Sequence, residues 1–266
     1  MFSRKDVHLK LHRPMKTAAI RAASSKPVLI IRTGRAPDAI RSRHGDFAHW
    51  LRLAAELLPA QLRVVDVAAG EDLPHPAEVS GAMITGSAAM VTERAGWSER
   101  TAGWIRDAMD VELPLFGVCY GHQLMAHALG GRVDYLPGGR EIGTLPIALT
   151  AQGVDDPLAA RLPASFRAHT THEQSVLEPP AGATVLASSA RDPHHLLRYG
   201  RRAISAQFHP EFNAEVMRGY IHRKREAMFR EGTDPHRVYR EVAATPVARN
   251  LLKRFARNHG LAPSPA

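Results

Sequence analysis

The chain has a single cysteine, Cys119, among its 266 residues. A disulfide within the chain is therefore excluded, and so is a zinc or iron–sulfur site that needs several thiolates. No apolar run approaches the roughly 18 residues that span a bilayer, so the sequence predicts no transmembrane helix. The 15 histidines are scattered without the helical i, i+4 pairing of a zinc site, so we expect no metal and no cofactor. We expect the pair His194 and His195 in a surface loop.

The net charge of +9 is concentrated near the start of the chain. Residues 1–26 contain seven Lys or Arg and one acid, whereas the other 240 residues contain 28 basic and 25 acidic groups. No zinc-finger or aromatic RNA-binding motif accompanies this charge, so we expect no nucleic-acid binding. Residues 1–26 are expected to form a basic, disordered extension, with an organellar transit peptide as the alternative. Because they lack an apolar core, a secretory signal is not expected, and we predict a cytoplasmic protein.

Short β-branched runs alternate with helical periodicity after residue 27. The predicted strands are 27–32, 63–67, 82–85 and 115–118, and the predicted helices are 48–58, 98–111 and 122–129. Strands that alternate with helices indicate an α/β fold with a parallel sheet covered on both faces. We therefore expect a flavodoxin-like (Rossmann-like), mostly parallel sheet flanked by helices.

The pattern changes in the second half of the chain. Strands are expected at 142–149, 166–169, 184–187, 196–199 and 204–208, some of them as antiparallel additions at one edge. From Glu211 onward the pattern is helical, with Arg223–Arg225 on a solvated face and a last amphipathic helix at 247–255. We therefore divide the chain into the extension 1–26, an α/β domain at 27–215 and a helical C-terminal appendage at 216–266.

The cysteine lies in the segment Gly117-Val-Cys-Tyr-Gly121, between a predicted strand and a predicted helix. A nucleophile on such a G-x-C-x-G turn has a tight backbone conformation, and the glycines allow the strand and helix to approach closely. The amides that open the helix favour a thiolate, and the N–H of Tyr120 is placed to meet an oxyanion. A buried structural cysteine at a turn is the alternative.

The second element is the segment Gln207-Phe-His-Pro-Glu-Phe212, which follows a predicted strand. Residues two apart in extended backbone point to the same side, so Glu211 can orient the imidazole of His209. A base beside the thiol, with a carboxylate behind the base, is the arrangement of an activated nucleophile. We therefore predict a catalytic triad of Cys119, His209 and Glu211.

Residues 117–123 (Gly-Val-Cys-Tyr-Gly-His-Gln) and 208–212 (Phe-His-Pro-Glu-Phe) together resemble the class I, triad-type glutamine amidotransferases. Within that family the chain is most similar to the GMP-synthase-like stand-alone glutaminases, over roughly residues 27–215. The resemblance implies a second oxyanion donor in the loop after the third strand. Where the family commonly has Gly-Gly-Pro, this chain has Gly86-Ser87-Ala88, so the expected donor is the amide of Ser87, with Gly86 beside the substrate.

The resemblance also implies contacts to the substrate. Gln123 would help to bind glutamine, and residues 171–176 resemble the loop that holds its amino-acid end, with Glu173 and Gln174 as the expected contacts. Structural alternatives are that Gln123 caps the helix start and that His172 fixes the loop by a hydrogen bond. His122 is expected to be structural, because it does not face the nucleophile.

The implied reaction hydrolyses the γ-amide of glutamine through a γ-glutamyl thioester on Cys119 and releases ammonia. The chain has no Walker-type phosphate loop and no room for a synthetase domain, so an ammonia-accepting synthetase would be a separate partner. Two alternatives stay open. The chain could be a γ-glutamyl peptidase or hydrolase, because only the leaving group differs, or a non-enzymatic regulatory protein on the same fold.

Overall fold

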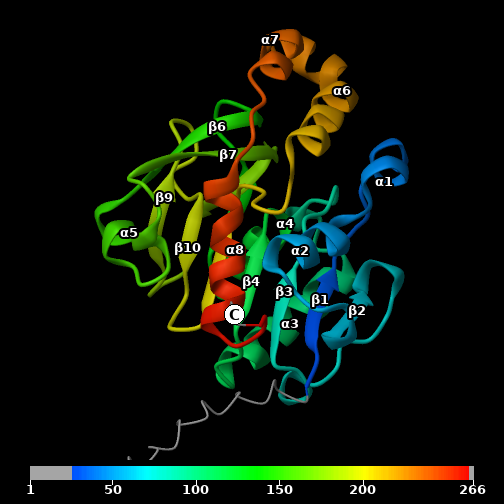
Figure 1. The fold of residues 1–266 in the computed structure, drawn as a ribbon, viewed down its shortest axis with the longest axis vertical. Coiled ribbons are helices and arrows are strands. Elements are labelled where there is room, and N and C mark those ends of the chain that lie inside the picture. Colours follow the sequence, from blue (N-terminus) through cyan, green and yellow to red (C-terminus); the bar gives the residue numbers. More distant parts are fainter. Residues whose placement is uncertain (1–25, 264–266) are drawn as a thin grey trace, which may run out of the picture.

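A nine-stranded mixed sheet forms the centre of the computed structural model, which describes residues 26–263 (Figure 1). The strand order is β2-β1-β3-β4-β11-β10-β9-β6-β7. The first five strands are parallel, and the other four pair antiparallel. Their bounds are β1 (Val28–Arg32), β2 (Leu62–Asp66), β3 (Gly81–Ile84), β4 (Leu115–Val118), β6 (Glu141–Leu149), β7 (Ser165–His172), β9 (Thr184–Ser188), β10 (Leu196–Arg198) and β11 (Ala203–Ala206).

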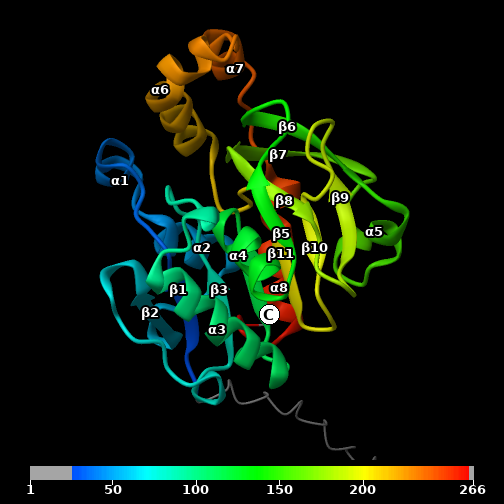
Figure 2. The same cartoon turned by 180° about the vertical axis from the view of Figure 1, so that it is seen from behind.

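Helices cover both faces of this sheet. In Figure 1, α2 (Phe47–Ala55) and α8 (Pro246–Asn258) lie in front of it, and Figure 2 shows α3 (Gly96–Asp110) and α4 (Tyr120–Ala128) on the other face. Separate hydrophobic clusters fill the two interfaces. The predicted parallel sheet with antiparallel strands added at one edge is confirmed, and its two-faced burial explains why the strands read as continuous apolar runs.

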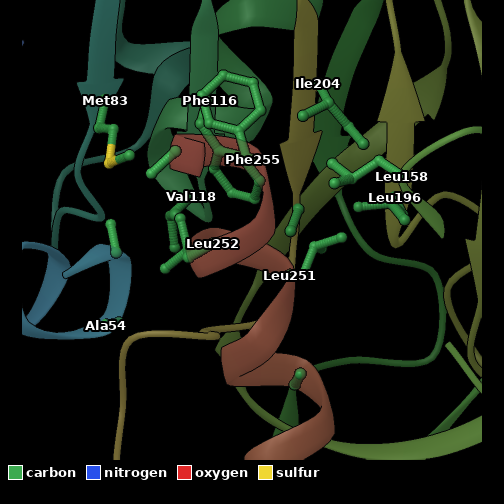
Figure 3. Packing of buried hydrophobic residues seen from close by; sticks show 14 of the residues in the cluster. Ala54, Met83, Phe116, Val118, Leu158, Leu196, Ile204, Leu251, Leu252 and Phe255 are labelled. Atoms are coloured by element: carbon green, nitrogen blue, oxygen red, sulfur yellow. The ribbon is translucent and has the colours of Figure 1, made fainter. Parts of the chain in front are cut away.

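The last helix is the main cover of the front face. Its apolar residues Ala248, Leu251, Leu252 and Phe255 are fully buried and recur at helical spacing. Figure 3 shows Phe255 against Phe116 of the sheet, where the two rings meet edge to face at 5.2 Å. Burying side chains of this size contributes about 2 kcal/mol each. The segment after residue 216 is therefore helical, but α8 belongs to the core of the α/β domain.

Two other helices of that segment stand apart from the sheet. In Figure 1, α6 (Ala214–Arg230) and α7 (Pro235–Arg240) project at one end of the molecule, with α1 (Asp38–His44) beside them. A cluster that includes Ile40, Phe212, Val216 and Ile221 joins these helices to the domain. The expected extension 1–26 falls almost wholly outside the described residues.

A small second sheet pairs β5 (Arg132–Tyr135) with β8 (Gln174–Glu178), and α5 (Ala151–Asp155) follows β6. Neither β5 nor β8 was predicted, because both are short and their alternation is interrupted by charged residues. Among residues 26–263, no helix combines the length and apolarity that a bilayer crossing needs.

Candidate active site

Cys119 occupies a strained turn between β4 and α4. Its φ of 51° and ψ of −100° lie in a region that residues with a side chain rarely adopt. The flanking glycines are required by space, because a Cβ at Gly117 would lie 2.5 Å from the carbonyl oxygen of Gly121. A Cβ at Gly121 would in turn lie 2.6 Å from the carbonyl oxygen of Ile84. Both glycines of the G-x-C-x-G pattern are therefore needed for α4 to pack directly against the ends of β3 and β4.

His209 and Glu211 reach the cysteine because β11 lies parallel to β4. Ala206 pairs with Val118 at the carboxyl ends of these strands, and the amide of Cys119 donates to the carbonyl of Ala206 at 2.8 Å. The chain after β11 therefore passes beside the elbow, where ligands bind in open α/β sheets. His209 Nδ1 and Glu211 Oε1 are 2.7 Å apart, and both side chains are buried.

The charge on His209 follows from these neighbours. Burial acts to lower the pKa of His209, but the Glu211 carboxylate and Cys119 outweigh it and raise the pKa to about 10. His209 is therefore an imidazolium at neutral pH. Its Nε2 has no hydrogen-bond partner of ordinary geometry among residues 26–263, although Cys119 is close enough to contribute to the shift.

The imidazole is clamped between an aromatic ring and a glycine. The ring of Phe212 stacks on His209 at a centroid distance of 4.0 Å and 19°. On the loop after β3, a Cβ at Gly86 would lie 3.1 Å from Cε1 of His209 and 3.7 Å from Cβ of Cys119. Gly86 thus lies against both groups, and any side chain there would press on the base.

The loop after β3 is held in place by Thr33 at the end of β1. Oγ1 of Thr33 donates to the carbonyl of Thr85 at 3.0 Å, and Oγ of Ser87 donates to the carbonyl of Thr33 at 2.8 Å. These bonds fix Ser87, which lines the cleft together with Cys119 and Tyr120. Within residues 26–263, neither the Ser87 nor the Tyr120 amide donates to another backbone group.

The cleft brings together most of the expected substrate residues. Gln123 is buried at its base, where Nε2 donates to the carbonyl of Gln174 at 2.6 Å and to Oε1 of Gln207 at 2.9 Å. Gln174 Nε2 donates to Thr92, and its Oε1 is buried without a partner among residues 26–263. The lining comes from the loop after β3, the elbow with the start of α4, the residue before β6, the junction of β7 with β8, and α6. Its residues are Ser87, Ala88, Ala89, Met90, Cys119, Tyr120, Gln123, Arg140, Thr171, His172, Glu173, Gln174 and Lys224.

Two cationic residues of this lining were not predicted. Arg140 and Lys224 each lie 2.9 Å from Oε1 of Glu173, and Arg140 also binds Glu231. Arg140 is 6% exposed, and its Nη1 is buried without a partner in the described structure. Lys224, within the predicted solvated face at 223–225, keeps 34% of its side chain exposed while its Nζ reaches Glu173. The one sequence signal near Arg140 is the preceding pair Gly138-Gly139, which forms a turn with two positive φ angles.

Two predictions about histidines can be judged here. His122 is fully buried and hydrogen-bonded to Oγ of Ser205, and burial lowers its pKa to about 3, so it is a neutral residue of the helix–sheet interface. The expectation that His194 and His195 form a surface pair is wrong for His195, which is fully buried and 2.7 Å from Glu141. A sharp turn at Asp192 directs His195 into the sheet as β10 begins.

A family model confirms the resemblance. Residues 44–226 match the model described as glutamine amidotransferase class-I. One component of the glutamine-hydrolyzing GMP synthase of Methanopyrus kandleri is 31% identical over 176 residues, which cover 65% of this chain and 87% of that protein. The glutamine-hydrolyzing GMP synthase of Aeropyrum pernix is 30% identical, and the match covers 63% of this chain and 31% of that protein.

Relatives of another kind are similar as well. The γ-glutamyl peptidase 5 of Arabidopsis thaliana is 28% identical, and the match covers 52% of this chain and 55% of that protein. This chain thus spans about a third of the Aeropyrum protein and about half of the Arabidopsis one. The crystal structure of a glutamine amidotransferase from Thermotoga maritima superposes with a TM-score of 0.69 at 22% identity, over 88% of this chain and 98% of that one. That similarity confirms the fold.

Proposed function

We propose that this chain, which belongs to the class I glutamine amidotransferase family, hydrolyses the γ-amide of glutamine through a thioester on Cys119. The observation that carries the proposal is the Cys119–His209–Glu211 arrangement next to a cleft that Cys119 lines. The thiol of Cys119, at the start of α4, lies near the imidazolium of His209. Oε1 of the buried Glu211 lies 2.7 Å from Nδ1 of that ring. This arrangement contains a nucleophile, a proton donor and an orienting group, and these three roles suffice for acyl transfer.

The first half-reaction would form the acyl enzyme. The Cys119 thiolate attacks the γ-carbonyl carbon, and the amides of Ser87 and Tyr120 donate to the oxyanion. His209 then gives its proton to the nitrogen as the C–N bond breaks, and ammonia leaves. Each oxyanion donor typically stabilises the transition state by about 3 kcal/mol.

The second half-reaction would restore the enzyme. The now neutral His209 takes a proton from water, which attacks the thioester carbonyl. The C–S bond breaks, glutamate leaves, and the thiolate–imidazolium pair is regenerated. Glu211 stabilises the imidazolium in both halves, because its carboxylate stays hydrogen-bonded to Nδ1.

Ammonia release from glutamine by the full chain tests this proposal, with Cys119→Ser as the control variant. A glutamine-analogue electrophile that adds one mass increment to the parent chain and none to Cys119→Ser has reacted at Cys119, the one cysteine of the chain. We expect labelling of the native chain and protection by glutamine. Equal labelling in the native and unfolded states without glutamine protection would contradict a built site.

A second candidate is γ-glutamyl peptidase activity, and the cationic side of the cleft favours it. Arg140 and Lys224 line the same cleft as Cys119, and Nη1 of Arg140 is buried without a partner in the described structure. A guanidinium N–H of this kind can bind a carboxylate, such as that of the amino acid leaving a γ-glutamyl dipeptide. Comparing kcat/KM for glutamine with that for γ-glutamyl dipeptides distinguishes the two candidates.

If glutamine is the substrate, we infer that the ammonia is used by a separate synthetase protein. The relative from Methanopyrus kandleri is named as one component of a GMP synthase, and this chain covers 87% of it. Stimulation of glutaminase activity by a co-purifying synthetase would support a partner of this kind. A high rate for the isolated chain, unchanged by any such synthetase, would count against it.

A further inference from the structure

A second cluster of histidines and carboxylates lies behind the loop that follows β7. Glu141 begins β6, His172 ends β7, Asp192 lies in the turn before β10, and His195 immediately precedes β10. All four side chains are buried, and one nitrogen or oxygen of each lies within 4.8 Å of the others. We propose that these residues form a binding site for a single divalent transition-metal ion, distinct from Cys119.

The charges of the cluster favour a dication. Glu141 and Asp192 are 5% and 0% exposed, and buried carboxylates are stable only when paired or bound to a cation. Within residues 26–263, no Lys or Arg lies within ion-pair distance of either one, and imidazoles are their only basic neighbours. Histidines that bind a metal do so as neutral imidazoles, and in that state the two carboxylates would leave a charge of −2, which one divalent ion neutralises.

The Nε2 atoms of both histidines face Glu141, and His172, unlike His195, also has an acceptor for its other ring nitrogen in the described structure. Nε2 of His172 and Nε2 of His195 both point at Oε2 of Glu141, at 3.1 Å and 2.7 Å. On the opposite side of its ring, His172 Nδ1 lies 3.0 Å from the carbonyl of Gln174. A metal-bound histidine almost always donates its other N–H to such an acceptor, which fixes the ring and the tautomer.

Both carboxylates are held by hydroxyl groups in the same manner. Ser189 Oγ donates to Oε1 of Glu141 at 2.6 Å, which leaves Oε2 facing the histidines. Ser175 Oγ donates to Asp192 at 2.5 Å, and the amide of His194 donates to Oδ1 of Asp192 at 2.8 Å. Such outer contacts orient ligating carboxylates in metal sites.

The donor set identifies the class of ion. Two imidazole nitrogens and two carboxylate oxygens suit Zn²⁺ and its first-row neighbours, which take tetrahedral ligands about 2.0–2.2 Å from the metal. Neighbouring ligands of such a site are then about 3.3 Å apart. The contact of 2.7 Å between Glu141 and His195 would open, and that of 4.0 Å between His172 and Asp192 would shorten. All four ligand sites are filled by protein, so the ion would be structural.

The site would stabilise the cleft from behind. The carbonyl of Gln174 accepts from both His172 and Gln123, so the ring of His172 connects the cluster to the base of the cleft. An ion held by β6, β7 and the start of β10 would keep this carbonyl, and with it Gln123, in one position. This role does not depend on which amide the enzyme cleaves.

Metal content is measured on the full chain carrying Cys119→Ser, so that no thiolate can bind zinc. After growth with zinc and dialysis against a weak chelator, we expect about one Zn²⁺ per chain. Asp192→Asn and His195→Gln should each lower the content at least about tenfold. The matched control is His194→Gln, which changes the adjacent histidine whose Nδ1 contacts the carbonyl of Val176 and should retain the ion.

A second measurement keeps the proposal testable if the buried variants fold poorly. Zn²⁺ added to the chelator-stripped Cys119→Ser chain should raise its Tm, and Co²⁺ should give the visible absorption of a tetrahedral site. Less than about one-tenth of an ion per chain, with no rise in Tm on adding Zn²⁺, would overturn the proposal. Full zinc content in the folded Asp192→Asn, His195→Gln double variant would overturn it too, because the ion would then lie elsewhere.

Discussion

His209 and His172 are both buried, and each lies beside a buried carboxylate, yet one histidine is open and the other is enclosed. His209 contacts Glu211 through Nδ1, while its Nε2 has no bonded partner in the described structure and Cys119 lies nearby. Both ring nitrogens of His172 are engaged, by the carbonyl of Gln174 and by Glu141. The same pair of side chains therefore occurs in two different settings in one fold.

His209 and His172 differ in whether one ring nitrogen is free to exchange a proton. A base must have one nitrogen free for the reacting groups, and this leaves a buried polar atom unsatisfied at a cost of about 1–3 kcal/mol. A framework histidine avoids that cost, because every polar atom is paired. Changes at the open site should therefore alter rate more than stability, and changes at the enclosed site should do the reverse.

The sharpest test of this comparison is Cys119→Ser. We expect kcat/KM to fall by about 10⁴-fold or more, because a serine at this elbow is a far weaker nucleophile beside the same base. The melting temperature should change by no more than about 2–4 °C, since the substitution nearly preserves volume. Ammonia release and thermal unfolding of the same preparation measure the two effects. Residual activity above one-tenth of the parent's would contradict the assignment of Cys119.

The next largest effect is expected for Glu211→Gln, which keeps the shape and removes the charge. We expect a loss of about 10³–10⁴-fold in kcat, by analogy with loss of the orienting carboxylate in other triads. The pKa of His209, raised to about 10 by Glu211 and Cys119, should fall, because burial still acts to lower it. Titration of the histidine ring by NMR measures this shift directly.

The same variant predicts a change in the pH dependence of stability. The imidazolium of His209 stabilises the parent fully below the usual histidine pKa of about 6.5, and this contribution is lost as pH rises toward 10. In Glu211→Gln the decline between these pH values should be smaller. Denaturant unfolding at pH 6.5 and pH 9.5 makes the comparison, and an unchanged decline would show that Glu211 does not set the charge of His209.

The site around Cys119 and His209 was the part of the molecule that the sequence predicted best. The triad residues fall in two short segments whose spacing reports local geometry, so a strand end and a tight turn bring them together. The enclosed cluster has no such signature, because Glu141, His172, Asp192 and His195 are scattered over 55 positions. Its residues meet only through the antiparallel pairing of β6 with β7 and the turn before β10.

The fold likewise has elements that the sequence predicted and elements that it did not. The parallel strands were predictable because continuous apolar runs mark strands covered on both faces. The strands β5 and β8 and the helix α1 were missed, since each is short and exposes polar residues along part of its length. The ion pair of Lys224 with Glu173 was not predictable, because periodicity describes one helix at a time and Glu173 lies outside α6.

At the enclosed site, Glu141→Gln should reduce stability more than rate. Removing the charge of one member of a buried polar cluster typically costs about 3–5 kcal/mol of unfolding free energy, because His172, His195 and Ser189 lose the charged acceptor of their hydrogen bonds. We expect kcat to stay within about tenfold of the parent while the chain is folded. Denaturant unfolding measures the loss, with Glu178→Gln as an exposed acid for comparison. A large drop in kcat with unchanged stability would place Glu141 among the reacting groups.

The smallest expected effect concerns Arg140, whose unpartnered Nη1 in the cleft resembles the free nitrogen of His209 more than the satisfied ring of His172. If it binds a carboxylate of the leaving amino acid, Arg140→Met should raise KM for γ-glutamyl dipeptides by about tenfold, or about 1.4 kcal/mol. KM for glutamine, which lacks that carboxylate, should change little, because Lys224 still neutralises Glu173. Arg132→Met removes an exposed arginine paired with Glu178 and controls for lost surface charge. An equal rise in KM for both substrates would instead assign Arg140 to the γ-glutamyl half, which they share.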